Sequence, residues 1–219
     1  INAVRIFNDL RADELVFLDI QASKENRLIS LDFVRDVGEE AKMPFAVGGG
    51  IKTIEDIRAI INAGAEKVII NTSAIQNPAF IREAANYFGS STIVVCIDEK
   101  KKLFKGNQTW MLNGSVSSGM TPVETARKME SLGAGEIIIQ SIDKDGTMTG
   151  YDLELIRTIS ETVAIPVIAL GGANSITDMK KARELGFASA MAAGSMFVYQ
   201  GSKKGVLINY IEKTEVNFE

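Results

Sequence analysis

The chain has 219 residues, 46% of them hydrophobic, and a formal net charge of −4. This length and composition suit one large α/β core, and the small negative charge argues against a basic nucleic-acid-binding face. The chain has no histidine, which excludes histidine triads, histidine metal sites and a histidine general base. Its one cysteine, Cys96, cannot form an internal disulfide, which favours a reducing cytoplasm. No apolar run approaches the roughly 18 residues of a membrane span.

Strand-like and helix-like patterns alternate along the chain. Continuous apolar runs, typical of strands buried on both faces, predict strands at 14–19, 45–48, 67–71, 92–98, 136–141, 167–170 and 188–193. Helical spacing predicts helices at 1–10, 29–42, 53–63, 77–88, 121–132, 152–163, 176–185 and 204–212. Residues 99–121 form the longest non-helical connection, where Lys105-Gly106-Asn107 and Asn113-Gly114 predict a two-stranded flap.

The stretch 44–73 recurs, without a gap, 122 residues later at 166–195. Seven of its thirty positions are identical, above the roughly two expected from ordinary composition. The identical pairs are Pro44/Pro166, Gly49/Gly171, Gly50/Gly172, Ile54/Ile176, Asp56/Asp178, Gly64/Gly186 and Ser73/Ser195. We infer that the chain is a doubled half, built from strand–loop–helix units.

Seven predicted strands alternate with helices in this repeat. The strand at 92–98 has no partner at the same offset, because 92 − 122 = −30 falls before residue 1. We therefore expect a single (β/α)₈ TIM-barrel domain over residues 1–219, with its first strand in about 30 N-terminal residues outside this sequence. A doubly wound open sheet is the rival fold, but it would not require the two halves to match at a constant offset.

The predicted strands end in small, polar or acidic residues, and active sites of such barrels lie at these carboxyl ends. Gly49-Gly50 and Gly171-Gly172 leave backbone N–H groups open to a ligand, and polar residues follow at the next strand ends. Two copies predict two phosphate sites facing each other across one opening. The alternative is that each glycine pair only turns the chain.

Four acidic residues at strand ends are candidates for proton transfer or for structural support. Asp98 ends a strand and is a candidate general acid or base. Asp143 and Asp145 follow another strand, where one would act on substrate and the other would hold the loop, unless both belong to a solvated turn. Asp19 fits a structural role at the edge of the core as well as it fits a role at the site. Cys96 is interpreted as inert core packing.

Charged residues stand at three strand starts, at the opposite end of the predicted barrel. These are Glu14, Lys67 and Glu136. They could form a salt-bridge plug that closes the barrel floor, or a gate in a passage through the floor. Their spacing alone favours the plug.

Several motifs together resemble the cyclase subunit family of imidazole glycerol phosphate synthase. They are Asp13–Ile20, Val47-Gly48-Gly49-Gly50-Ile51, Ile70-Asn71-Thr72, Gly133–Ile137 and Ser141–Thr147, and the resemblance runs from Ile1 to about Phe197. It implies a (β/α)₈ lyase of histidine biosynthesis in the cytoplasm, with two phosphate sites and no metal or other cofactor. It also implies a heterodimer with a glutaminase, which docks on the barrel floor and sends ammonia through the barrel. The ammonia would convert a bisphosphorylated formimino-carboxamide ribonucleotide to imidazole glycerol phosphate and aminoimidazole carboxamide ribotide.

The resemblance assigns roles to individual residues. It implies that Asp98 is the catalytic acid and that Asp145 lies on the approach to one phosphate, and we expect Asp98 and Asp145 to be the catalytic residues. The implied phosphate-binding residues are Gly50, Asn71 and Thr72 on one side, and Gly146, Gly172, Gly194 and Ser195 on the other. It implies that Glu14, Lys67 and Glu136 form an ammonia gate, against the plug favoured by spacing alone, and that Glu66 contacts the glutaminase.

Two other functions stay open from the sequence. Residues 113–120 and 197–210 resemble relatives encoded with surface-polysaccharide enzymes, which implies ammonia transfer to a sugar to form an amidine. A non-catalytic partner that binds and activates a glutaminase is the other possibility.

Overall fold

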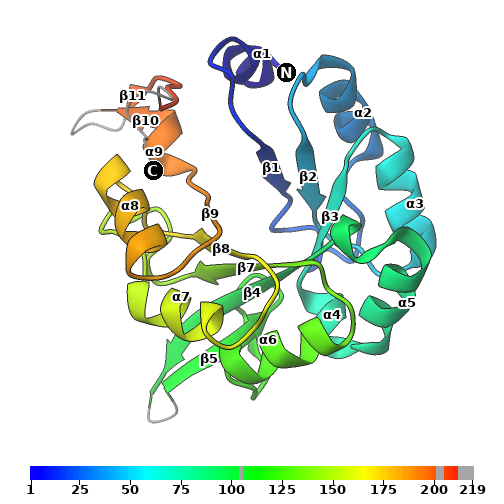
Figure 1. Cartoon of the computed structure of the whole chain (residues 1–219). Coiled ribbons are helices and arrows are strands. Elements are labelled where there is room, and N and C mark those ends of the chain that lie inside the picture. The colour runs from blue at the N-terminus through cyan, green and yellow to red at the C-terminus, as the bar shows by residue number, and fades with distance from the viewer. Residues whose placement is uncertain (104–105, 201–204, 212–219) are drawn as a thin grey trace.

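In this computed structural model, residues 1–103, 106–200 and 205–211 are described. Seven parallel strands pair in chain order around a central axis (Figure 1). They are β1 (Leu15–Leu18), β2 (Phe45–Gly48), β3 (Lys67–Ile70), β4 (Ile93–Lys102), β7 (Glu136–Ser141), β8 (Val167–Leu170) and β9 (Ala190–Met191). This is the arrangement of a TIM barrel, as the sequence predicts. The consecutive order excludes a doubly wound sheet, whose strand order reverses at a switch point.

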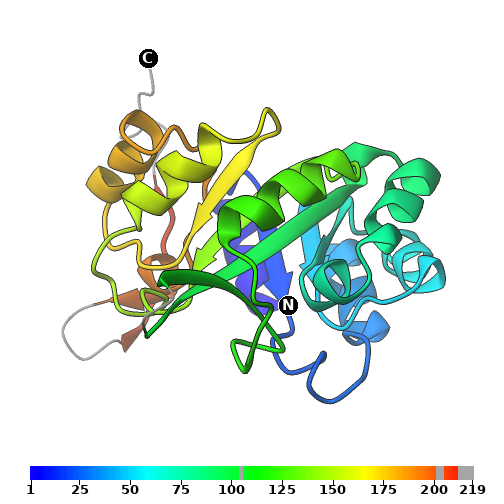
Figure 2. The same cartoon turned by 90° about the horizontal axis from the view of Figure 1, so that it is seen from below.

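Helices cover the outer face of the curved sheet (Figures 1 and 2). They are α1 (Asn2–Asp9), α2 (Leu31–Glu40), α3 (Ile54–Asn62), α4 (Thr72–Gln76), α5 (Ala79–Phe88), α6 (Pro122–Ser131), α7 (Leu153–Ser160), α8 (Ile176–Glu184) and α9 (Ser195–Val198), with a 3₁₀ turn at Ser90–Thr92. Among the described helices, none has the length and apolar character needed to cross a membrane.

Each strand presents two different faces, because successive side chains alternate. On β4, Val95 and Ile97 belong to the large core beneath the helices. Val94 and Cys96 point the other way, into a smaller apolar cluster inside the ring, and are followed on that face by Asp98. Because of this alternation, every second side chain of a strand points into the barrel interior.

The half-chain repeat is visible as repeated geometry. Gly49 and Gly50 after β2, and Gly171 and Gly172 after β8, all have positive φ. The helices that follow begin alike, since Thr53 accepts a hydrogen bond from the Asp56 amide while Asp56 caps the chain before it. Their counterparts at an offset of 122 repeat two of these contacts: Ser175 Oγ accepts the Asp178 amide, and Asp178 Oδ2 accepts the Asn174 amide. β2 and β8 lie four places apart in the strand order, so the glycine pairs stand at opposite parts of one rim.

The structure also revises several boundaries. β4 runs on to Lys102 rather than ending at Asp98, because it pairs with β5 (Gly106–Met111), which in turn pairs with β6 (Val116–Ser117). The predicted flap is thus confirmed, and Figure 1 shows its hairpin extending past α6 and α7. The predicted helix at 204–212 is wrong in its described part, because 205–206 form β11, paired with β10 (Tyr199–Gln200). Residues 204 and 212 lie outside the described residues.

β1 and β9 flank the remaining opening of the ring. In the part of the chain that the structure describes, each pairs with a parallel strand on one side only. Across this opening, the C-terminal segment contacts the N-terminal segment: the Tyr210 hydroxyl donates to Asp13 Oδ2 at 2.8 Å, and the Tyr210 ring packs edge-on against Phe7.

Candidate active site

The barrel interior is divided into three layers along the strands. Charged side chains occupy the amino-terminal end, and polar ones gather at the carboxyl end. Between them lies an apolar band of Ala46, Ile69, Val94 and Ile138, extended by Leu18, Ile168 and Leu170. A cavity of about 840 Å³ includes this interior, from Glu14 and Glu136 at one end to Gln140 and Asp145 at the other, and also extends between β1 and β9 to Val4 and Met179.

Asp98 stands in the polar layer on β4, opposite Gln140 on β7. The side chain is partly buried, and this burial raises the pKa of Asp98 to about 6, with a further rise from the negative charge of Asp145. A hydrogen bond from the Cys96 thiol, at 3.4 Å from Asp98 Oδ1, opposes the rise. A carboxyl group with this pKa exchanges protons near neutral pH, as a general acid or base must.

The predicted phosphate residues of the second half form one small pocket. It is lined by Asp145, Gly146, Gly171, Gly172, Ala173, Ala193, Gly194 and Ser195. Gly172 has no room for a side chain, because a Cβ there would lie 2.4 Å from the Gly150 carbonyl oxygen. The pocket wall is therefore mostly backbone, which suits recognition of an anion by N–H groups.

The predicted phosphate residues of the first half lie at the ends of β2 and β3. Ser73, in α4, donates from its hydroxyl to the Ile51 carbonyl at 2.5 Å, which ties the loop after β2 to the start of α4. Thr72 is buried, and its Oγ1 accepts the Leu112 amide of the flap at 3.1 Å. Asn71 donates from Nδ2 to the Cys96 carbonyl at 3.0 Å and to the Trp110 carbonyl at 3.3 Å. These residues therefore join the rim to the flap.

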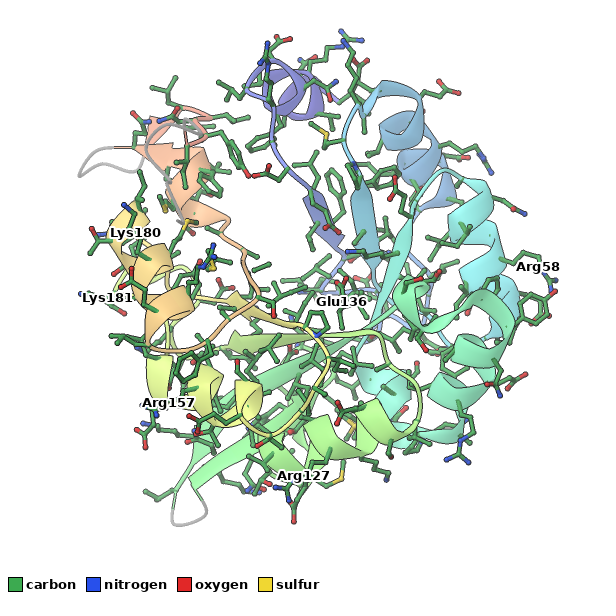
Figure 3. All side chains as sticks on the ribbon, in the orientation of Figure 1. Arg58, Arg127, Glu136, Arg157, Lys180 and Lys181 are labelled. Atoms are coloured by element: carbon green, nitrogen blue, oxygen red, sulfur yellow. The ribbon has the colours of Figure 1, made fainter. Side chains whose placement is uncertain are left out.

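The floor of the barrel is closed by one cation between two carboxylates. Lys67 Nζ lies 2.9 Å from Glu136 Oε1 and 3.3 Å from Glu14 Oε2. Burial lowers the pKa of Lys67, but the hydrogen bond to Glu136 and the charge of Glu14 outweigh it, and the net shift is upward. Figure 3 shows Glu136 inside the ring, whereas Arg58, Arg127, Arg157, Lys180 and Lys181 lie on the outer helices. Glu66 is exposed at the same end as Lys67.

Two acids at the rim have structural partners. Asp19 accepts from Arg27 Nη1 at 2.5 Å and from the amides of Gln21 and Ala22, and the Arg27 hydrogen bond lowers the pKa of Asp19 against the effect of burial. Asp143 Oδ2 accepts the Lys101 amide at 3.3 Å, which links its loop to the flap. Of the two acids after β7, Asp145 is thus the one on the candidate site.

The polar residues that the sequence analysis missed are Gln140 and Glu99. Gln140 Nε2 lies 3.4 Å from Asp145 Oδ2. Glu99 faces away from the barrel interior and is only 1% exposed, and its Oε2 accepts the Ser141 hydroxyl at 3.2 Å. Its other oxygen, Oε1, has no hydrogen-bond partner among the described residues. The burial of Glu99 could have been predicted from its place directly after Asp98, because alternation along a strand puts its side chain on the helix side of the sheet.

Glu99→Gln is expected to flatten the pH dependence of stability. Burial raises the pKa of Glu99, so the folded chain holds a proton that the unfolded chain releases above the ordinary glutamate range. The free energy of unfolding therefore falls as pH rises through the interval between the unfolded and folded pKa values. Glutamine keeps the size of the side chain and is always neutral. Urea denaturation at several pH values should therefore show the free energy of unfolding of the variant rising relative to that of the parent chain as pH rises. Glu83→Gln on exposed α5 is the control, and parallel curves for Glu99→Gln and the parent would contradict this prediction.

Fold and site together define a TIM-barrel protein with a carboxyl group of raised pKa and a small backbone-walled pocket at the carboxyl rim. No group of three or more candidate metal ligands is found in the described residues. Comparison with known proteins identifies the family within this class of barrels. A model of the family described as "Histidine biosynthesis protein" matches residues 1–204, and the chain belongs to that family.

Three curated relatives carry the name imidazole glycerol phosphate synthase subunit HisF. The protein from Alkaliphilus metalliredigens (strain QYMF) is 48% identical over 195 residues, covering 89% of this chain and 77% of the relative. That from Lachnoclostridium phytofermentans is 48% identical over 209 residues, covering 94% and 80%. That from Clostridium botulinum (strain Langeland) is 44% identical over 214 residues, covering 97% and 85%. These relatives favour the synthase prediction over the polysaccharide-sugar alternative.

Proposed function

We propose that this chain is the ammonia-dependent cyclase subunit of imidazole glycerol phosphate synthase, acting in the cytoplasm. The substrate is the bisphosphorylated formimino-carboxamide ribonucleotide, and the products are imidazole glycerol phosphate and aminoimidazole carboxamide ribotide. The observation that carries the proposal is the layered interior, which runs from the Lys67 ion pairs through an apolar band to Asp98. Names of the relatives support the same reaction.

The layers suit the passage of neutral ammonia. The apolar band disfavours an ammonium ion, because transfer of an unpaired charge into apolar surroundings is costly. Ammonia, unlike ammonium, has a free lone pair with which to attack an electrophilic carbon. A glutaminase bound beneath Glu14, Lys67 and Glu136, with Glu66 in its contact surface, would deliver ammonia at the floor.

The rim would hold the substrate across the opening. Gly50, Asn71 and Thr72 would bind one terminal phosphate, and Gly146, Gly172, Gly194 and Ser195 the other. A bisphosphate held at both ends places its middle over Asp98 and Asp145. Asp98 would then donate or accept the proton that moves as the ring closes and the carbon–nitrogen bond to the ribotide breaks, with Asp145 close by on the other side of Gln140.

We also infer that residues 1–219 belong to a single barrel domain, with an eighth parallel strand between β1 and β9. The unpaired strand edges support this inference. Both strands have an unpaired edge within the described residues, and these two edges face the same opening of the ring.

Lys67→Met is expected to impair synthesis that uses ammonia from glutamine but not synthesis that uses added ammonia. Methionine keeps the length of the side chain but removes the cation that holds Glu14 and Glu136 together, so the floor loses its organisation while the rim is unchanged. In the complex with the glutaminase, product formation per glutamine hydrolysed should fall several-fold, whereas synthesis from added ammonium salts should stay close to that of the parent. Lys181→Met on exposed α8 is the matched control (Figure 3). An equal loss with both nitrogen sources would argue against a passage through the floor.

A further inference from the structure

Two side chains connect the two candidate acids of the rim. Asp98 and Gln140 face each other on the paired strands β4 and β7, and Cys96 precedes Asp98 on the same face. Cys96 Sγ lies 3.4 Å from Asp98 Oδ1 and 3.9 Å from Gln140 Oε1. Gln140 Nε2 in turn lies 3.4 Å from Asp145 Oδ2. The four side chains thus form a continuous path from one carboxyl group to the other.

The chemistry of these groups fixes the direction of the contacts. An ionised carboxylate only accepts hydrogen bonds, a thiol has one proton to donate, and an amide offers both donor and acceptor. Gln140 must therefore turn its NH₂ group to Asp145, since its oxygen there would face a carboxylate. The same choice places Gln140 Oε1 3.9 Å from the thiol, while the one S–H proton is directed to the nearer acceptor, Asp98 Oδ1, at 3.4 Å.

The thiol is held in its protonated form by the same surroundings. Burial raises the pKa of Cys96 well above its ordinary value, and the negative charge of Asp98 raises it further. Cys96 is therefore an S–H donor throughout the range in which Asp98 titrates. The titratable groups that act on Asp98 are Cys96 on its own strand and Asp145 from the loop after β7.

We propose that Cys96 and Gln140 are positioning residues, the thiol donating to Asp98 and the amide holding Asp145, so that the two carboxyl groups act as one coupled pair. The role given to this pair rests on the proposed function. The hydrogen-bonded path itself does not, and it is measurable without turnover. If Cys96 were only core packing, its contact with Asp98 would have no effect on the state of the carboxyl group.

The test uses the thiol as a spectroscopic probe. The sequence has one cysteine, so the infrared S–H stretching band assigned by difference against Cys96→Ser reports on Cys96. In the complete gene product, the band should lie at a frequency lowered by hydrogen bonding and should move further down as Asp98 ionises, with a midpoint near pH 6. Asp98→Asn should abolish this movement. A band at the frequency of a free thiol, unchanged by pH, would overturn the proposal whether or not the protein makes the expected products.

Kinetics supply the second readout. Cys96→Ala removes a donor that stabilises the ionised form of Asp98, so the acidic limb of the kcat/KM profile should move to higher pH by up to about one unit. Cys96→Ser restores a donor and should bring the limb back toward its original place. Gln140→Met keeps the length but cannot donate to Asp145, and it should lower kcat more than it raises KM. Identical limbs in the parent and Cys96→Ala would contradict the proposal.

Discussion

Asp98→Asn is expected to lower synthesis from added ammonia by about 10²- to 10⁴-fold, the usual contribution of a general acid or base. Asparagine has almost the same shape, but its amide cannot exchange protons near neutral pH. Burial raises the pKa of Asp98 to about 6, so if Asp98 accepts the proton as a base, the pH–rate profile of the parent protein should also show an acidic limb near pH 6. Steady-state assays with ammonium salts, across a range of pH, measure both effects.

The control for Asp98 is Asp32→Asn, which makes the same change on the outer helix α2, where the side chain is 88% exposed. Circular dichroism and urea denaturation should show that both variants are folded. If Asp98→Asn made product as fast as the parent, Asp98 would not be the proton-transfer group.

Gly50→Ala is expected to give the largest loss of stability among changes of one methyl group at the rim. Gly50 has φ +70°, and a Cβ there would lie 1.8 Å from the Arg27 carbonyl oxygen. The left-handed conformation alone costs a non-glycine residue about 1–3 kcal/mol. Relief of the clash must also displace either the loop that carries Arg27 or the backbone after β2. Urea denaturation should show a lower midpoint, and the KM for the phosphorylated substrate should rise.

Gly119→Ala separates the clash from the conformational cost. Gly119 has φ +80°, but no heavy atom lies within 4 Å of a Cβ placed there. Both variants therefore bear the cost of a left-handed alanine, and only Gly50→Ala meets the Arg27 carbonyl. Equal losses of stability in the two variants would show that the close approach at Gly50 is unimportant, and an unchanged KM in Gly50→Ala would argue against a phosphate site there.

Most of the barrel could be predicted because its halves repeat. Positive φ requires the glycines at 49, 50, 171 and 172, and the unpaired amides at two helix starts require the hydroxyl caps Thr53 and Ser175. The same local requirements therefore select the same or similar residues in both halves. Apolar runs located the strands because both of their faces are covered. The extension of β4 was missed, since polar Lys100–Lys102 carry no apolar signal and are held by pairing with β5. The helix expected at 204–212 is wrong in its described part, 205–211, because pairing of 205–206 with 199–200 overrides the helical spacing.

The site was predictable where side chains stand at strand ends and less so where contacts cross strands. Asp98 and Asp145 follow apolar runs, which marks them directly in the sequence. Their connection through Cys96 and Gln140 depends on the register between β4 and β7, which no local pattern specifies. Cys96 is buried as expected, but burial alone could not show that its thiol would meet Asp98.

The most direct test of the whole account is to identify the products. The complete gene product, supplied with the bisphosphorylated formimino-carboxamide ribonucleotide and ammonium salts, should form imidazole glycerol phosphate and aminoimidazole carboxamide ribotide in equal amounts, detected by liquid chromatography and mass spectrometry. Unchanged ribonucleotide, together with ammonia nitrogen incorporated into a nucleotide sugar, would contradict the account.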